Sequence, residues 1–244
     1  MNLLKNILGR IFALWALLVF ACSLLIYFIP IWITGLWPEP KRTVYVFKIF
    51  DIWMATFFIF SGVKRKITGK DNFKKGQVYV VVCNHNSFMD VPLSSSAIPG
   101  ANKTIAKDEM AKIPVFGTIY KRGSVLVNRK SEESRRASYT KMKEVLRMGL
   151  HMCIYPEGTR NKTSQPLQRF HDGAFKLAIE TGKAVIPAVI FNTTKVLPTH
   201  KTFFFWPQQV EMHFLPAVET SGRSTQDLKE EVFTIMKNYY LEHQ

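Results

Sequence analysis

The chain has no charged residue between positions 11 and 38, and this long apolar run limits where its N-terminus can lie. A helix over residues 11–29 would extend about 28 Å, close to the hydrocarbon thickness of a bilayer. We expect Pro30 to interrupt this helix, because proline removes a backbone donor and its ring clashes with the preceding turn. The run is longer than the apolar part of an ordinary secretory signal.

A second apolar run extends from Val44 to Val63 and carries only two charged residues. Basic residues stand before, between and after the two runs: Lys5, Arg10, Lys41, Arg42, Lys64, Arg65 and Lys66. Because cytoplasmic flanks are rich in Lys and Arg, one span would leave one cluster on the wrong side. We therefore expect residues 1–66 to form two apolar helices embedded in one leaflet, with a single membrane span as the alternative. This arrangement implies a membrane-associated protein whose globular part is cytoplasmic, at the inner membrane if the source is bacterial.

The net charge of +15 predicts a polyanionic partner: nucleic acid, anionic lipid or a phosphorylated substrate. No nucleic-acid-binding motif accompanies the charge, and the apolar N-terminus favours lipid and a membrane surface. The three cysteines have no metal-type spacing, and we expect them to be free, buried thiols. We expect neither a metal site nor a nucleotide-binding motif.

After residue 66 the pattern becomes globular. Short β-branched runs alternate with amphipathic segments, which predicts an α/β domain over residues 67–244. The expected strands are 77–83, 103–107, 123–127, 151–155, 184–191 and 209–215, and the expected helices are 89–97, 131–148, 173–180 and 224–240. In such folds functional sites gather at the carboxyl ends of strands.

His85 and Asp90 follow the first of these strands in the string Asn84-His85-Asn86-Ser87-Phe88-Met89-Asp90. A neutral imidazole accepts protons near pH 7, and a carboxylate can fix its tautomer and stabilise the imidazolium. Five residues across a strand-to-helix turn are enough to bring Asp90 back to His85. A surface histidine and a helix-start aspartate that never meet are the alternative.

No nucleophile motif accompanies this histidine, so the base is expected to activate a hydroxyl of the substrate. Three basic residues, Lys107, Arg129 and Arg160, also follow predicted strands. An arginine fork binds phosphate through two donors, and lysine adds a point charge. Solvated surface charges are the alternative for each of the three taken singly. Glu157 is expected to orient the arginines or to hold its loop, and Gly158 permits close backbone approach.

These strings resemble the conserved blocks of the glycerolipid acyltransferases, most closely the 1-acyl-sn-glycerol-3-phosphate acyltransferases. The family's Asn-His-x-Ser-x-x-Asp block is similar to residues 84–90, and its Gly-x-Ile-x-Ile-Asp-Arg block to Gly123–Arg129. Its Phe-Pro-Glu-Gly-Thr-Arg-Ser block is similar to Tyr155–Asn161, and its Val-Pro-Val block to Ile186–Val189. The resemblance covers residues 78–190, with the blocks in order. The chain departs from it at Asn86, where Gln is common, at Asn128 for Asp and at Asn161 for Ser.

The resemblance implies a mixed sheet flanked by helices, with an acyltransferase domain over residues 67–244. It implies that His85 is the general base and Asp90 its partner, and that the acceptor's phosphate is held by Arg129, Glu157, Gly158 and Arg160 with help from Lys107. The implied reaction acylates the sn-2 hydroxyl of lysophosphatidic acid from acyl-CoA or acyl carrier protein, giving phosphatidic acid without any cofactor. Other lysophospholipids, amino-acid lipids and glycerol 3-phosphate remain alternative acceptors. A thioester hydrolase and a non-catalytic membrane-binding protein are the competing classes.

Overall fold

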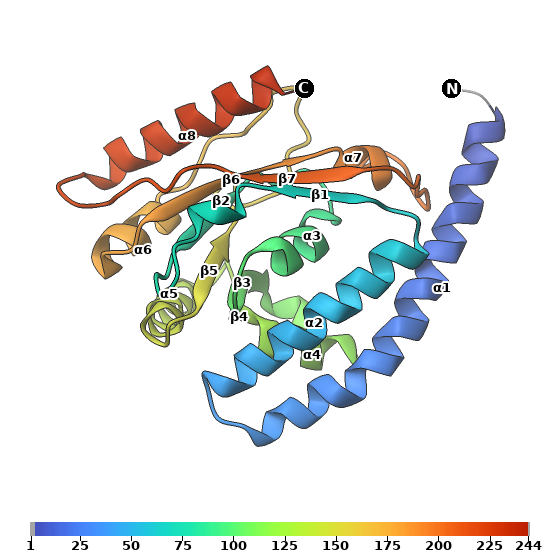
Figure 1. Cartoon of the computed structure of the whole chain (residues 1–244), viewed down its shortest axis with the longest axis horizontal. Helices are drawn as coiled ribbons and strands as arrows, with labels where there is room; N and C mark the ends of the chain where they lie inside the picture. Colours follow the sequence, from blue (N-terminus) through green and yellow to red (C-terminus); the bar gives the residue numbers. More distant parts are fainter. Residues whose placement is uncertain (1–2, 244) are drawn as a thin grey trace.

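The N-terminus folds as a hairpin of two helices. A computed structural model describes residues 3–243, and Figure 1 shows α1 (Leu3–Ile33) and α2 (Lys41–Phe60) side by side along one flank of the molecule. A 3₁₀ turn at Thr34–Leu36 begins the connection between them. Both helices are long and apolar enough to cross a membrane, a judgement that rests on length and composition alone.

The expectation that Pro30 ends the first helix is wrong, because α1 continues through it to Ile33. Near the end of the helix, groups outside it donate hydrogen bonds to a backbone carbonyl of the last turn. The Ile31 carbonyl accepts hydrogen bonds from the Thr34 hydroxyl, at 2.6 Å, and from the Arg122 guanidinium. These contacts serve the end of the helix, whereas the carbonyl that Pro30 leaves without an intrahelical donor is that of Ile26, one turn earlier.

The rest of the chain is built on one seven-stranded mixed sheet in the order β1-β7-β6-β2-β5-β3-β4. All neighbouring strands are parallel except β6 and β7. The predicted α/β class with a mixed sheet and flanking helices is confirmed. The strands are β1 (Arg65–Thr68), β2 (Val80–Cys83), β3 (Asn102–Lys107), β4 (Ser124–Val127), β5 (His151–Ile154), β6 (Val185–Phe191) and β7 (Val210–Phe214).

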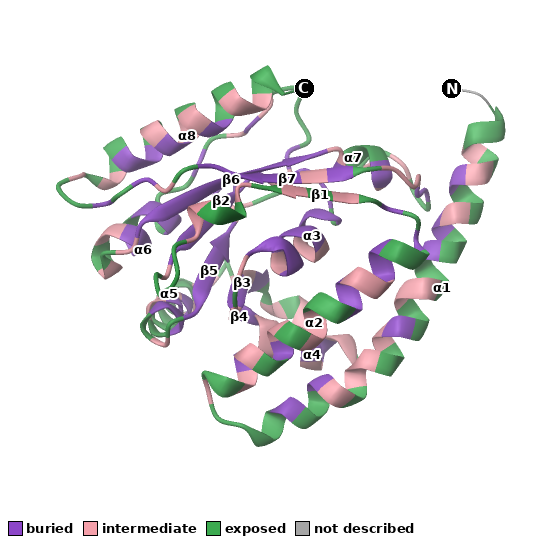
Figure 2. Cartoon of the chain, viewed as in Figure 1, coloured by how far each residue is buried: buried purple, intermediate pink, exposed green. Residues whose placement is uncertain are grey.

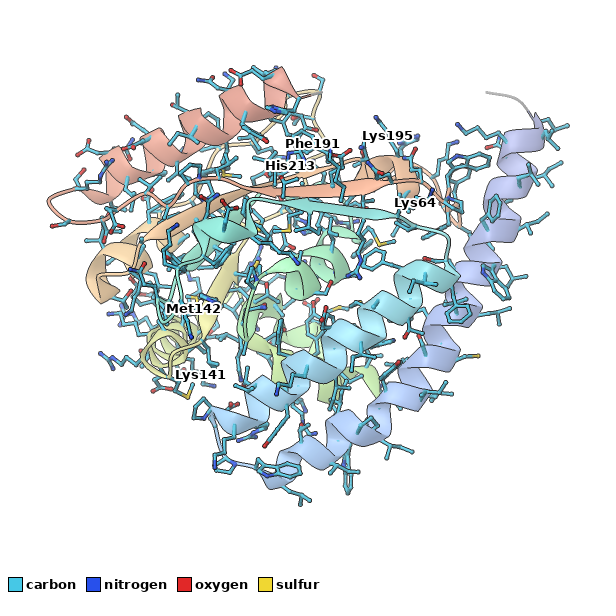
Figure 3. All side chains as sticks on the ribbon, in the orientation of Figure 1. Lys64, Lys141, Met142, Phe191, Lys195 and His213 are labelled. Carbon is cyan, nitrogen blue, oxygen red and sulfur yellow. The ribbon has the colours of Figure 1, made fainter. Side chains whose placement is uncertain are left out.

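Helices cover both faces of the sheet, as Figure 1 shows. They are α3 (Asp90–Ala97), α4 (Phe116–Gly123), α5 (Glu132–Arg147), α6 (Gly173–Thr181), α7 (Thr193–Val196) and α8 (Thr225–Glu242). Each face of the sheet carries its own apolar core, and alternate residues of β2 belong to different cores. Val81 and Cys83 pack with residues of α1 to α4, whereas Val80 and Val82 pack with α5, α6 and α8. Figure 3 labels Met142 of α5, which is buried, beside Lys141, which is exposed. The domain therefore has three layers.

The hairpin contributes to the core of the sheet. Trp53, Met54, Phe57 and Phe58 of α2 are buried in the same cluster as Val81 of β2. The outer face of α1 is exposed, as Figure 2 shows along much of the helix, and is mostly apolar, whereas the exposed positions of α2 combine Ile52, Ile59 and Phe60 with Lys41, Lys48 and Asp51. One face thus packs on the protein while the other is available to lipid.

Polar contacts also join the hairpin to the sheet. Lys103 of β3 forms an ion pair with Glu39 at 2.9 Å, just before α2 begins. Burial acts to raise the pKa of Glu39, but its hydrogen bonds with Thr43 and Lys103 prevail and lower it. The division expected between residues 66 and 67 falls inside β1, a strand that the sequence analysis did not anticipate.

Two of the three cysteines are buried as expected. Cys83 and Cys153 lie on adjacent strands with their sulfur atoms 3.8 Å apart, and all three cysteines are free thiols. Cys22 is exposed on α1, contrary to the expectation of burial, because its position lies on the outer face of the hairpin.

Candidate active site

The carboxyl ends of four parallel strands bring the candidate residues to one edge of the sheet. His85 follows β2, Glu157 follows β5 and Arg129 follows β4, while Lys107 is the last residue of β3. Strands β2, β5, β3 and β4 are consecutive neighbours, so their ends open on the same side. The sheet topology therefore accounts for the convergence of motifs that are about seventy residues apart in the chain.

His85 and Asp90 are in direct contact. The Nδ1 atom of His85 lies 2.8 Å from Oδ2 of Asp90, and the carboxylate is fully buried at the first residue of α3. The same oxygen accepts the backbone N–H groups of Asn86, at 2.6 Å, and Ser87, at 2.7 Å. Because a carboxylate only accepts, Nδ1 carries the proton and Nε2 is left as the basic atom. The sequence-based prediction that Asp90 returns to His85 is confirmed.

The side chains of Asn84 and Ser87, on either side of His85, form hydrogen bonds with backbone groups and not with the imidazole. The side chain of Asn84 continues the pairing of β2 with β6, donating to the Ile190 carbonyl at 3.0 Å and accepting the Ile190 N–H at 2.7 Å. The Ser87 hydroxyl donates to the carbonyl of Leu197 at 2.9 Å. Ser87 is therefore committed elsewhere and forms no nucleophile–base pair with His85.

Glu157 braces the backbone of the site. Its Oε1 accepts the His85 N–H at 2.8 Å, and its Oε2 accepts the Gln168 N–H at 2.9 Å. Burial raises the pKa of Glu157 to about 7, although both backbone hydrogen bonds act in the opposite direction. The carboxyl group connects the loops after β2 and β5, as the hypothesis that it holds a loop requires.

Gly158 has a backbone conformation that favours glycine. Its φ of +72° is left-handed, and a Cβ there would lie 3.0 Å from the ring of His171. The exposed Arg129 donates from Nη1 to the Gly158 carbonyl, so the loop after β4 is tied to the turn after β5.

The other two cations of the candidate site, Arg160 and Lys107, lie at the same edge of the sheet. The guanidinium of Arg160 lies 3.6 Å from the ring centroid of the exposed Phe88, two residues from Asp90. Lys107 is exposed, and within residues 3–243 its ammonium forms no hydrogen bond or ion pair. Arg129 and Arg160 are therefore linked through contacts to the loops of the His85 pair, whereas Lys107 is near them only by strand register.

Tyr155 lies beside His85, a role that its place in the Tyr155–Asn161 motif did not indicate. Its ring centroid lies 4.4 Å from that of His85, and its hydroxyl is 2.7 Å from that of Ser94 on α3. Burial raises the pKa of this phenol well above its usual value. The backbone of Asn161 also donates to the His85 carbonyl at 2.6 Å. The available signal was a tyrosine at a motif position where the family usually has phenylalanine.

Comparison with known proteins identifies the class to which this fold and site belong. The acyltransferase family model matches residues 64–191, more than half of the 244 residues, and the chain belongs to that family. The paired His85 and Asp90 and the Glu-Gly-Thr-Arg turn at residues 157–160 lie within the matched region.

The chain is also similar to individual proteins of this family. The chain is 30% identical over 144 residues to the 1-acyl-sn-glycerol-3-phosphate acyltransferase of Borreliella burgdorferi, covering 59% of this chain and 55% of that protein. It is 29% identical over 189 residues to the human 1-acyl-sn-glycerol-3-phosphate acyltransferase beta, covering 77% and 67%. The crystal structure of the 1-acyl-sn-glycerophosphate acyltransferase PlsC from Thermotoga maritima superposes with a TM-score of 0.81, covering 99% and 97% at 24% identity. That similarity shows a shared fold.

Proposed function

We propose that this chain transfers a fatty acyl group from an acyl thioester to the free sn-2 hydroxyl of lysophosphatidic acid, giving phosphatidic acid. The observation that carries the proposal is the contact between His85 and the buried Asp90 at the edge where Arg129 and Arg160 also lie. A base and a phosphate-binding surface side by side suit an acceptor that carries both a hydroxyl and a phosphate. The names of several relatives support this acceptor.

His85 acts as the general base in the proposed mechanism. Its Nε2 takes the proton of the acceptor hydroxyl as the oxygen attacks the thioester carbonyl. The C–O bond forms first, and collapse of the tetrahedral intermediate then breaks the C–S bond. The imidazolium returns its proton to the departing thiolate. Asp90 stabilises the imidazolium while it exists and keeps Nε2 facing the substrate.

The acceptor's phosphate is assigned to Arg129 and Arg160, with Lys107 adding charge from the end of β3. Glu157 and Gly158 serve that site indirectly, by holding the turn that presents Arg160 and by receiving the Arg129 contact. An arginine pair discriminates a phosphomonoester by charge and by its planar fork. The two roles can be tested separately: loss of the base removes thiol release, and a preference for lipids without a phosphomonoester tests the arginines.

The membrane position follows from the hairpin. We assign its exposed apolar face to one leaflet and the catalytic domain to the cytoplasmic side, at the inner membrane in a bacterium. Acceptor and product dissolve in lipid, and an interfacial helix keeps the site at their depth. Acyl-CoA or acyl carrier protein is the donor from the aqueous side, and the reaction requires no cofactor.

The proposal is tested by thiol release from protein purified in detergent. We expect free thiol from acyl-CoA or acyl carrier protein only when lysophosphatidic acid is present. H85A removes this release without unfolding the chain, whereas H200A, at an exposed histidine far along the sequence, retains it. Release without any acceptor would indicate a hydrolase, and preference for a lipid without a phosphomonoester would contradict the role of the arginines.

A further inference from the structure

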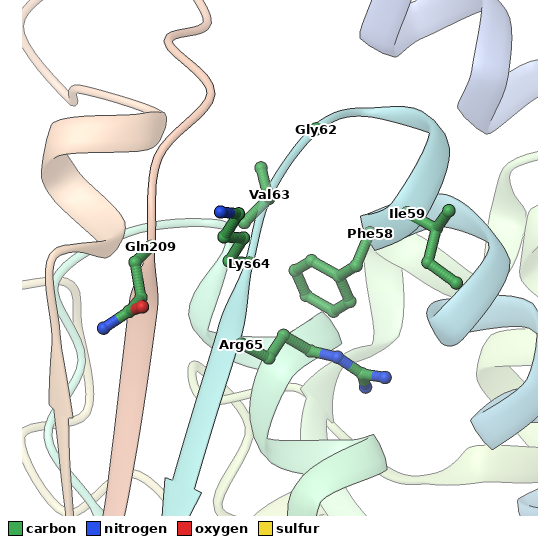
Figure 4. A pocket seen from close by; sticks show the side chains of 7 residues that line it. All are labelled: Phe58, Ile59, Gly62, Val63, Lys64, Arg65 and Gln209. Atoms are coloured by element: carbon green, nitrogen blue, oxygen red, sulfur yellow. The ribbon is translucent and has the colours of Figure 1, made fainter.

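A surface pocket of ≈ 520 Å³ lies where α2 ends and β1 begins (Figure 4). Its wall includes Phe58, Ile59, Lys64, Arg65 and Gln209. Strands β1 and β7 run opposite to β6, so their first residues lie at the edge where β6 and β2 end. The pocket is therefore on the catalytic edge of the sheet, although none of its lining residues belongs to the candidate active site.

The pocket is lined by two cations and no carboxylate. Figure 4 shows Arg65 reaching beneath the ring of Phe58, while Lys64 lies on the side of Gln209. The Arg65 guanidinium lies 5.0 Å from the Phe58 ring centroid and donates to the Ser96 hydroxyl at 3.2 Å. Burial lowers the pKa of Arg65, and Asp51 attracts it only weakly in comparison.

Neither cation forms a direct ion pair within the described part of the chain, and Asp51 acts on Arg65 only from a distance. Residues 3–243 contain no carboxylate within 4.0 Å of the charged nitrogen atoms of Lys64 or Arg65. By contrast, the next lysine, Lys66, pairs with Glu211 at 3.1 Å. A partly desolvated guanidinium is costly to keep unpaired, and an anion bound in the pocket would offset that cost.

Exposed apolar side chains adjoin the cations. Ile59 is 73% exposed and Phe60 is 60% exposed at the last turn of α2. Trp15 of α1 is also exposed, and its indole donates to the Phe60 carbonyl at 2.7 Å. A small hydrophilic anion would leave this surface in water, whereas a ligand with a phosphate and hydrocarbon chains would cover it.

We propose that this pocket binds the phosphate of an anionic glycerophospholipid, with the acyl chains lying along Ile59, Phe60 and Trp15. The bound lipid neutralises Lys64 and Arg65 and fixes the catalytic edge at the level of the headgroups. The site is distinct from the one that holds the acceptor, and binding there does not require acyl transfer.

The experiment uses the full chain in nanodiscs of phosphatidylcholine with a minor fraction of phosphatidylglycerol that carries a diazirine on its acyl chain. Light is expected to label the peptide that contains Ile59 and Phe60. R65Q and K64Q are each expected to lower this labelling about tenfold, the loss of one charge-assisted hydrogen bond. K75Q is the matched control at an exposed lysine outside the pocket, and it is expected to label as the unaltered chain does.

The competing outcomes are separable. Equal labelling of R65Q, K64Q and the unaltered chain would overturn the proposal. Displacement by inorganic phosphate at the lipid's own concentration would also overturn it, because the apolar wall would then contribute nothing. R65K keeps the positive charge and is expected to retain labelling. If R65Q fails to fold, K64Q tests the proposal in its place, because Lys64 is exposed. H85A is expected to label normally, so failure of the proposed acyl transfer leaves this result unaffected.

Discussion

The imidazole of His85 lies against the ring of Tyr155, with the centroids 4.4 Å apart and the planes inclined by 32°. The Tyr155 hydroxyl is in turn held by Ser94 at 2.7 Å. The ring beside the imidazole is thus anchored to α3, the same helix that begins with Asp90. Both sides of the imidazole are positioned by one helix.

Y155F is expected to lower kcat several-fold while leaving KM for the acceptor unchanged. The variant keeps the aromatic contact but loses the hydrogen bond to Ser94, which contributes about 1 kcal/mol. Steady-state kinetics for Y155F and S94A provide the measurement, and both are expected to show the same loss because they break the same bond. Y45F, at an exposed tyrosine, is the control. A change confined to KM would contradict the positioning role.

D90N is expected to reduce kcat about a hundredfold or more, in keeping with the loss seen when a base loses its orienting carboxylate. The amide cannot accept three N–H donors on one atom as Oδ2 does, and it favours the wrong tautomer of His85. The pH dependence of kcat/KM reports the base directly. If D90N retained full activity with an unshifted profile, the assigned partnership would be wrong.

E157A is expected to lower kcat and to destabilise the fold by about 1–3 kcal/mol, because two partly buried N–H groups lose their acceptor. These donors belong to His85 and Gln168. E157Q can still accept one of them and should recover part of the activity. Chemical unfolding and kinetics on both variants provide the test, and equal activity of E157A and the unaltered chain would remove Glu157 from the site.

His151 is expected to make the fold less stable in acid. It accepts the Tyr79 N–H at 3.1 Å, and burial lowers its pKa to about 4 although the Pro99 carbonyl acts in the opposite direction. The unfolded chain binds this proton near pH 6.5 and the folded chain does not. Stability is therefore lost as the pH falls from about 6.5 to 4, by about 3 kcal/mol.

Unfolding of H151N at a series of pH values measures this contribution. Asparagine can accept the same N–H but does not titrate, so the difference between H151N and the unaltered chain should change across that window. A constant difference between pH 7 and pH 4 would show that His151 is not responsible.

The Glu39–Lys103 ion pair is expected to couple the hairpin to the sheet. Both side chains are partly shielded, so a double-mutant cycle with E39Q and K103M should give a coupling energy of about 1–2 kcal/mol. Limited proteolysis between α1 and α2 offers a second readout, with faster cleavage in either single variant. Additive effects in the cycle would mean that apolar packing alone holds the hairpin.

The strands that lead into the site could be predicted from the sequence, because runs of β-branched residues are a local pattern. Buried β-branched runs such as Val80–Cys83 end directly before the motif residues, and the structure places those ends together. The edge strand β1 (Arg65–Thr68) was not predicted, because it is short and its first two residues belong to a basic cluster. Its strand character comes from pairing with β7, about 145 residues later, which no local pattern contains.

The contact between His85 and Asp90 was predictable from the sequence, but the residues that support it were not. The spacing of His85 and Asp90 implied their contact, because both lie in one strand-to-helix turn. The anchoring of Tyr155 by Ser94 required knowing that α3 packs beside β5, a relation between segments sixty-one residues apart. The expectation at Pro30 was wrong because it rested on helix propensity alone, whereas α1 continues to Ile33, near the contact of Arg122 with the Ile31 carbonyl.

The burial of α2 against the sheet limits how this enzyme can be produced as a fragment. Deleting the hairpin would uncover the surface now covered by Trp53, Met54, Phe57 and Phe58. Each of these side chains gains about 1.5–3 kcal/mol from burial, and their sum is comparable with the whole stability of a typical domain. A truncated catalytic domain designed for expression without detergent should therefore aggregate, however polar its remaining surface.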